Sequence, residues 1–299
     1  MEEIKLKAKD DLELNIHVFK AENAKAVVQI IHGMEEHQER YERFANFLNK
    51  NGYTVVSSDM RGHGKTAKDL GFFKEKNGYS LLVSDQEIIT NYIKSTFANL
   101  PIYIFAHSMG TIITRVLLQE NSNNYSKVVL SGYPNYQSGA KAGIFVTNLI
   151  KAFRGAKFKS KFVEKLAVGA FNKQIKNPRT NLDWLSKNET NVDNYILDPL
   201  CGIGFTVSSY NDLFHLVTKM HNPKNYKNVK NNLPFLMLRG KDDPCTGGEK
   251  GAEDSRNTLA KAGFENLTYI DYDDMRHEIL NEIDYEKVQN DILKFFNKQ

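Results

Sequence analysis

The sequence predicts an α/β fold with a mostly parallel central sheet and helices on both faces. Short apolar runs, of which AVVQII at 26–31 is the clearest, have the composition of strands buried on both faces. Stretches with apolar residues at helical spacing lie between these runs, and this alternation is typical of parallel βαβ units. From residue 134 to residue 232 the alternation lapses, which indicates an inserted helical cap. We therefore expect a core made of 1–133 and 233–299, with a cap or lid at 134–232.

The individual elements follow from the spacing of apolar residues. Leu12, Leu14, Ile16 and Val18 alternate with other residues, which is the period of a half-buried strand. Continuous apolar runs predict further strands at 26–31, 53–58, 102–105, 127–131, 233–239 and 267–271. Helical spacing predicts helices at 39–50, 85–97, 112–117, 144–153, 252–262 and 285–296.

The composition is that of an ordinary globular protein, because 41% of the 299 residues are hydrophobic and 25% are charged. The N-terminal stretch MEEIKLKAKDDLELN carries charges where a signal peptide would be apolar. No apolar run approaches the ~18 residues of a membrane span, so we expect a cytoplasmic protein. Cys201 and Cys245 are too few for a disulfide framework and lack metal-ligand spacing, so we expect free thiols.

A serine stands between a predicted strand and a predicted helix, in the stretch IYIFAHSMGT at 102–111. Small residues two positions before and two after such a serine let strand and helix approach closely and project the hydroxyl outward. Here they are Ala106 and Gly110, so alanine replaces the first glycine of the usual Gly-x-Ser-x-Gly pattern. Ser108 is therefore a candidate nucleophile.

Polar residues also follow the last predicted strands, and ligands of open parallel sheets bind at such strand ends. Asp242 and Asp243 follow one of these strands, and His277 follows the next. Serine needs a histidine to take its proton and a buried carboxylate to orient that histidine. We assign these roles to His277 and Asp243. Asp242 is the competing acid, but Asp243 directly precedes Pro244, whose fixed geometry would hold the loop. The chain order Ser, Asp, His is that of α/β-hydrolases.

An oxyanion formed during acyl transfer needs hydrogen-bond donors. In this kind of fold the donors are backbone N–H groups, one from the residue after the nucleophile and one from a loop after an early strand. The first residue is Met109. The second is Met34, in the loop His32-Gly33-Met34, whose glycine lets the chain turn close to the substrate.

Three stretches resemble binding motifs without matching them. DMRGHGKT at 59–66 has Asp59 where a phosphate-binding loop needs glycine. HEILN at 277–281 ends in asparagine where a zinc motif needs histidine. DYDDMR at 271–276 lacks the fifth-position oxygen ligand and sixth-position glycine of an EF-hand. We therefore expect no metal, no cofactor and no bound nucleotide.

Taken together, the motifs resemble the monoacylglycerol lipase and lysophospholipase family of the α/β-hydrolase superfamily. The matching segments are HGMEEHQERY at 32–41, DMRGHG at 59–64, HSMG at 107–110, DPLC at 198–201, Gly240 with Asp243, and HE at 277–278. The resemblance implies an α/β-hydrolase fold, ester hydrolysis through an acyl-enzyme, no cofactor, and a cap over an acyl-chain tunnel. It also implies that Glu36, Arg40 and His107 lie near the glycerol head group.

Two residues depart from the family pattern. Ala106 replaces the first glycine of the elbow, but alanine is still small. Glu35 occupies a position where a small residue is often found. Because Glu35 adds charge near the head-group site, it bears on the identity of the substrate.

The predicted cap is strongly basic. Residues 141–230 contain fifteen Lys and Arg against six Asp and Glu, a net charge of +9, whereas the rest of the chain carries −5. Between 151 and 176 the basic residues are interleaved with phenylalanines. Such a segment suits contact with an anionic membrane or micelle, and equally a small cap with solvated lysines over its own active site. No nucleic-acid-binding module accompanies the charge, so no nucleic acid partner is expected.

The sequence thus predicts a serine carboxylester hydrolase that acts on a small lipid ester. Monoacylglycerol, cleaved to fatty acid and glycerol through an acyl-enzyme on Ser108, is the expected substrate. A lysophospholipase or a short-chain carboxylesterase is the alternative within the same class. A ligand receptor on a hydrolase scaffold, with vestigial turnover, is the alternative from a different class.

Overall fold

The computed structural model describes residues 1–298 and contains an eight-stranded sheet with the order β1-β2-β4-β3-β5-β6-β7-β8. The strands are β1 (Glu2–Lys7), β2 (Glu13–Phe19), β3 (Ala26–Ile31), β4 (Tyr53–Ser58), β5 (Ile102–His107), β6 (Lys127–Ser131), β7 (Phe235–Gly240) and β8 (Leu267–Tyr272). β2 pairs antiparallel with β1 and with β4, whereas all pairs from β4 to β8 are parallel. The predicted mostly parallel α/β architecture is confirmed.

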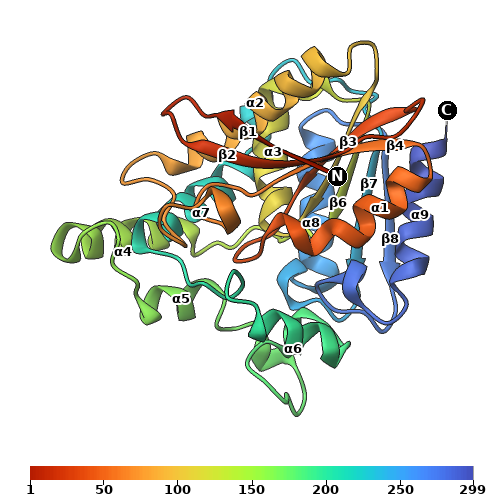
Figure 1. Cartoon of the computed structure of the whole chain (residues 1–299). Helices are drawn as coiled ribbons and strands as arrows, with labels where there is room; N and C mark the ends of the chain where they lie inside the picture. The colour runs from red at the N-terminus through yellow and green to blue at the C-terminus, as the bar shows by residue number, and fades with distance from the viewer. Residues whose placement is uncertain (299) are drawn as a thin grey trace.

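Helices cover both faces of the sheet (Figure 1). The helices of the core are α1 (Glu42–Lys50) and α9 (Tyr285–Asn297) on one face, and α2 (Gly78–Thr96), α3 (Met109–Asn121) and α8 (Gly248–Lys261) on the other. Successive side chains of a strand point to opposite faces. In β3, accordingly, Val27 joins the cluster with α3, whereas Val28 joins the cluster with α1. This two-sided burial explains why β3 is a continuous apolar run rather than an alternating one.

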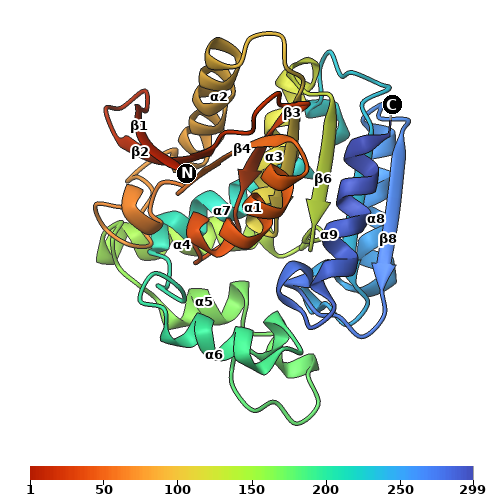
Figure 2. The same cartoon turned by 45° about the vertical axis from the view of Figure 1, so that its right-hand side comes forward.

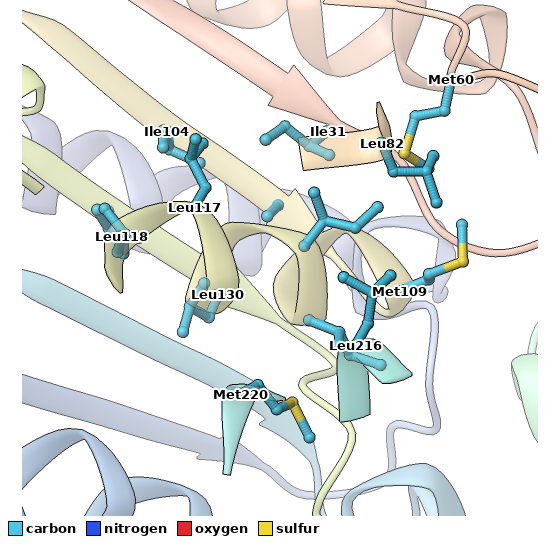
Figure 3. Close-up of a cluster of buried hydrophobic side chains, with 14 of the residues drawn as sticks. Ile31, Met60, Leu82, Ile104, Met109, Leu117, Leu118, Leu130, Leu216 and Met220 are labelled. Atoms are coloured by element: carbon cyan, nitrogen blue, oxygen red, sulfur yellow. The ribbon is translucent and has the colours of Figure 1, made fainter. Parts of the chain in front are cut away.

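The larger of the two core clusters surrounds α3 (Figure 3). Leu117 of α3 points toward Ile104 of β5, and Leu216 of α7 (Val207–Met220) lies beside Met109 at the start of α3. All four side chains are buried. The helix that begins directly after Ser108 is therefore held between the sheet and α7.

Most predicted elements are present, with shifted ends. β3, β4 and β6 have the predicted bounds, but α2 begins at Gly78 rather than at residue 85. A Cβ atom at Gly78 would lie 2.3 Å from the Asp212 carboxylate of α7, so the start of α2 depends on a contact distant in the sequence. The edge strand β1 was not predicted, because its partly exposed side chains lack a strong apolar pattern.

Between β6 and β7 lie α4 (Ala140–Arg154), α5 (Lys161–Ala167), α6 (Glu189–Leu197) and α7. The first three lie beyond one end of the sheet (Figures 1 and 2). α7 packs both against α4 of the predicted cap and against α2 and α3 of the core. The division into core and cap at residues 134 and 232 stays a prediction. The helix α7 lies within the predicted cap but contributes side chains to the main core.

Within residues 1–298, no helix is long and apolar enough to cross a membrane. Cys201 and Cys245 are both buried free thiols, as predicted.

Candidate active site

Ser108 is the single residue between β5 and α3. Its backbone is strained, with φ at 50° and ψ at −119°. Gly110 makes the turn possible, because a Cβ atom there would lie 2.2 Å from the carbonyl oxygen of Ile31. Ala106, by contrast, is fully buried within the paired strand β5, so its extra methyl group is accommodated in the core.

Hydrogen bonds connect Ser108, His277 and Asp243 in a chain. His277 Nε2 lies 2.8 Å from Ser108 Oγ, and His277 Nδ1 lies 2.9 Å from Asp243 Oδ2. The other carboxylate oxygen of Asp243 accepts the N–H of Cys245 at 2.7 Å. Asp242 points elsewhere and pairs with Lys187 at 2.6 Å. The structure therefore brings Asp243, and not Asp242, to the histidine.

The buried environment of His277 favours its protonated form. Burial alone would disfavour the imidazolium, but the charge of Asp243 and its hydrogen bond outweigh that effect, with smaller contributions from Glu278 and Glu36. The pKa of His277 is consequently raised above the ordinary value of 6.5. A histidine tuned this way is a strong acceptor for the proton of a nucleophilic serine.

Met34 and Met109 flank Ser108 as expected for oxyanion donors. Met109 is the first residue of α3, and Met34 lies in the loop after β3. Among the residues that the structure describes, neither N–H donates to another protein group. Both backbone donors are thus available to a ligand. A Cβ atom at Gly33 would lie 3.1 Å from Ser108 Cβ, so this loop approaches the serine closely.

Glu36 holds the loop that carries Met34. One oxygen of its carboxylate accepts the Gly33 N–H at 2.5 Å and the Tyr41 hydroxyl at 2.7 Å. The other oxygen accepts from Arg40 at 2.6 Å. Because its oxygens are already used in this way, Glu36 determines the shape of the loop as well as lining the cavity.

Arg40 contacts this loop through Glu36 and does not line the main cavity. Its guanidinium makes a two-point contact with Glu278, with distances of 2.8 and 2.7 Å. It also donates to Asn191 of α6 at 3.2 Å. The structure therefore places Arg40 in an ion-pair network between core and cap.

His107 does line the cavity, and its ring centroid lies 4.8 Å from that of His277. Burial lowers the pKa of His107 to about 4, so the ring is neutral near pH 7.

The DMRGHG segment at 59–64 forms hydrogen bonds to the same loop. Asp59 accepts the backbone N–H of Gln38 and of Lys65, at 2.9 Å each. His63 Nε2 accepts the N–H of Glu35 at 3.2 Å, and burial lowers the pKa of His63 to about 3. The segment is therefore a scaffold for the residues beside Met34, a role that the sequence pattern alone did not indicate.

A cavity of about 870 Å³ opens above Ser108, His277 and the two methionines. Side chains from core and cap line it, and its apolar wall comprises Ile112, Ala140, Leu213, Phe214 and Val217. Polar residues line it near the loop after β3 and near His277, and charged cap residues line it as well: Lys161, Glu164, Lys165 and Lys173. The cavity thus combines a long apolar wall with a polar region next to the candidate nucleophile.

One cap residue that completes the site, Trp184, was missed by sequence reasoning, whereas His37 and Asp198 lie in segments that carry the family resemblance. Trp184 lines the cavity, and its ring centroid lies 5.1 Å from that of His277. His37 pairs with Asp198 at 2.8 Å, which ties the loop after β3 to the segment after α6. The only signal in the sequence was that Trp184 is the single tryptophan of the chain. Its approach to His277 depends on how the cap folds back over the core.

The sheet order and the serine on its strained turn, with histidine and aspartate at the ends of later strands, define an α/β-hydrolase. Within that class, the chain belongs to the family described as serine aminopeptidase, S33, whose model matches residues 22–284.

Curated relatives confirm the resemblance seen in the motifs. The chain is 26% identical over 220 residues to a human monoglyceride lipase, a match that covers 73% of this chain and 65% of the relative. It is 24% identical over 279 residues to a monoacylglycerol lipase of Mycolicibacterium smegmatis, covering 90% of this chain and 86% of the relative. The chain thus spans 65%, less than two thirds, of the length of the human relative that it matches.

Solved structures share the fold. A thermostable carboxyl esterase from Bacillus coagulans, solved in complex with glycerol, has a TM-score of 0.92 at 22% identity and covers 99% of this chain and 97% of its own. A soluble variant of monoglyceride lipase from Saccharomyces cerevisiae, solved with a substrate analog, has a TM-score of 0.74 at 19% identity and covers 99% and 94%.

Proposed function

We propose that this protein is a carboxylic ester hydrolase that cleaves single-acyl lipid esters, with monoacylglycerol as the main substrate. The observation that carries the proposal is the hydrogen-bonded chain Ser108–His277–Asp243 at the floor of a cavity with an apolar wall. The names of the curated relatives support a lipid ester as substrate.

In the acylation step, Ser108 Oγ attacks the ester carbonyl carbon while His277 Nε2 takes the hydroxyl proton. The negative oxygen of the tetrahedral intermediate accepts hydrogen bonds from the backbone N–H groups of Met34 and Met109. Asp243 stabilises the imidazolium and keeps His277 Nδ1 protonated. Collapse of the intermediate breaks the bond to the alcohol oxygen, which leaves as glycerol with the proton from His277.

In the deacylation step, water takes the place of the alcohol. His277 removes one proton from the water as its oxygen attacks the acyl carbon on Ser108. The second tetrahedral intermediate collapses with return of the proton to Ser108 Oγ. The products are a free fatty acid and the regenerated hydroxyl, so the cycle needs no metal and no cofactor.

The test is hydrolysis of a panel of monoacylglycerols, lysophospholipids and short esters by the wild-type chain and by Ser108→Ala. We expect turnover of monoacylglycerol above about 1 s⁻¹, the lower end of typical enzyme values, and its loss in the variant. Faster cleavage of lysophospholipids or short esters would show that these esters, and not monoacylglycerol, are the main substrate. Ligand binding without turnover of any ester would identify a receptor on a hydrolase scaffold instead.

We further propose that α4 and α5 contact anionic lipid surfaces. Phe145, Leu149 and Phe153 form one stripe along α4 and are 71%, 51% and 80% exposed. Phe162 and Leu166 of α5 are 63% and 54% exposed. Basic residues on these helices make no ion pair within the described residues: Lys141, Lys151, Arg154, Lys161 and Lys165. Apolar side chains bordered by free cations suit the boundary of an anionic lipid layer.

Co-sedimentation with lipid vesicles tests this contact. We expect binding to anionic vesicles that weakens as salt rises, and a loss of binding in the double variant Phe145→Ser/Phe153→Ser. Ile283→Ser is the matched control, because Ile283 is 74% exposed outside the cap. Equal partition onto neutral and anionic vesicles would contradict the proposal.

A further inference from the structure

The imidazole ring of His277 is in contact with two other rings. Its centroid lies 4.8 Å from that of His107 and 5.1 Å from that of Trp184. Its two nitrogens are hydrogen-bonded to Ser108 and Asp243, which belong to the predicted core, as His107 does. Trp184 belongs to the predicted cap. A cap residue thus touches the ring of the candidate base directly.

The backbone around Trp184 is hydrogen-bonded to the loop that carries His277. Trp184 lies in the 3₁₀ turn η5 (Asp183–Leu185). Glu278, the residue after His277, donates its N–H to the carbonyl oxygen of the residue after Trp184, at 2.8 Å. The guanidinium of Arg276, the residue before His277, donates to the carbonyl oxygen of the residue before Trp184, at 2.6 Å. The two neighbours of Trp184 in the chain are therefore bonded to the two neighbours of His277.

The buried carboxylate of Glu282 joins the same two segments again. It accepts hydrogen bonds from the Ser186 hydroxyl and from the Arg276 N–H, both at 2.7 Å. Hydrogen bonds to a charged, buried acceptor are among the stronger ones in proteins. Because one carboxylate binds both segments, the indole of Trp184 has a defined position relative to the imidazole of His277.

The surroundings of His277 leave its ring little freedom. Its side chain is almost completely buried, although it lines the cavity together with Trp184. A Cβ atom at Gly132 would lie 3.1 Å from His277 Nδ1, so the backbone there closes another part of its surroundings. With the indole in contact, the imidazole has less room to rotate, and fewer water molecules can lie against it.

Resting on the proposed ester hydrolysis, we propose that Trp184 is a positioning residue whose indole holds the His277 imidazole in the orientation that serves Ser108. A general base acts only when its nitrogen is within hydrogen-bond reach of the proton that it takes. Without the indole, the imidazole can rotate and water can compete for Nε2. The loss therefore falls on kcat. Because the contact is one between ring surfaces, phenylalanine can replace tryptophan in this role.

Hydrolysis of the water-soluble ester p-nitrophenyl butyrate tests the proposal without lipid surfaces. We expect Trp184→Ala to lower kcat about tenfold, equivalent to about 1.4 kcal/mol, and Trp184→Phe to stay within about threefold of the wild type. Phe97→Ala is the matched control, because Phe97 is also a half-buried aromatic residue but lies outside the cavity, and it leaves kcat unchanged. A loss confined to KM, or an equal loss of kcat in Trp184→Phe or in Phe97→Ala, would overturn the positioning role.

The wild-type protein provides a second measurement that does not depend on the folding of a Trp184 variant. Trp184 is the single tryptophan of the chain, so tryptophan emission reports on this residue alone. A protonated imidazole in contact with an indole quenches its emission more strongly than a neutral one. We expect the emission to fall as the pH drops through the pKa of His277, which is raised above 6.5. His277→Gln lacks this step.

The comparison with His277→Gln is needed because other titratable groups face His277: those of Glu36, His107, Asp243, Cys245 and Glu278. Burial lowers the pKa of His107 to about 4 and raises that of the Cys245 thiol well above its usual value. Burial alone would raise the pKa of Glu278, but the Arg40 guanidinium lowers it. None of these three groups changes its charge near pH 6.5, the ordinary pKa of histidine.

The outcomes separate this proposal from the proposed function. The same emission step in His277→Gln, or an emission that stays constant through the pKa of His277 in the wild type, would overturn the contact between the two rings. Failure of the wild type to hydrolyse any ester, with the emission step present, would instead overturn the proposed function.

Discussion

Arg40 forms a two-point ion pair with Glu278. Glu278 directly follows His277, the histidine that is hydrogen-bonded to Ser108. The same guanidinium contacts Glu36, which holds the Met34 loop through the Gly33 N–H. One buried cation thus links the two loops that flank the candidate nucleophile. Because the charge of Arg40 stabilises both loops at once, we expect its removal to lower the free energy of unfolding substantially.

Replacing Arg40 with alanine leaves Glu36 and Glu278 buried without a counter-charge. We expect the free energy of unfolding to fall by about 3 to 5 kcal/mol, because a broken buried pair leaves uncompensated charge. Chemical denaturation measures this. Arg179→Ala is the control, since Arg179 also pairs with a carboxylate, Asp193, but at the exposed surface, and it changes stability little. Equal losses in the two variants would contradict a structural role for Arg40.

Asp243→Asn removes the charge that orients His277. Comparable substitutions reduce kcat by about ten-thousand-fold, because the histidine adopts the wrong tautomer. We expect a loss of this order for the hydrolysis of p-nitrophenyl butyrate. Asp242→Asn, which disturbs only the pair with Lys187, retains activity. If the two variants exchanged these outcomes, the acid of the site would be Asp242.

The pH profile of hydrolysis reports on His277. Only the neutral imidazole accepts the serine proton, and the pKa of His277 is raised above 6.5. Activity is therefore full above the raised pKa and falls as the pH drops through it. Burial raises the pKa of the nearby Glu35 to about 7, so the rate for p-nitrophenyl butyrate is also measured in the Glu35→Gln variant to separate the two ionisations. A rate that stays constant through and below pH 6.5 would contradict this role of His277.

Gly110→Ala tests the turn at Ser108. The added Cβ atom would lie 2.2 Å from the Ile31 carbonyl oxygen, so the strand or the helix must shift. We expect a loss of about 1 to 3 kcal/mol in stability, as for other overpacked sites, and a larger loss of activity because Ser108 moves. Gly139→Ala is the control for stability, since a Cβ atom there meets nothing within 4 Å. Unaltered melting and activity in Gly110→Ala would show that the elbow tolerates the methyl group.

Local sequence patterns were sufficient for the buried strands of the sheet but not for the partly exposed edge strand β1. β3, β4 and β6 have the predicted bounds because strands buried on both faces must be apolar throughout. The elbow could be identified from Ser108 and Gly110, because close approach of strand and helix excludes larger side chains. By contrast, α2 begins earlier than predicted, since its first turn meets Asp212 of α7.

The sequence by itself determined the α/β architecture and the elbow, because these depend on local periodicity and on residue size. The order of serine, acid and histidine can be read directly along the chain. Only the tertiary structure decided which aspartate reaches His277, that Arg40 is occupied by Glu36 and Glu278, and that Trp184 lies against the histidine. Those contacts join residues far apart in the chain. Their geometry depends on how loops and cap pack, and periodicity carries no information about that packing.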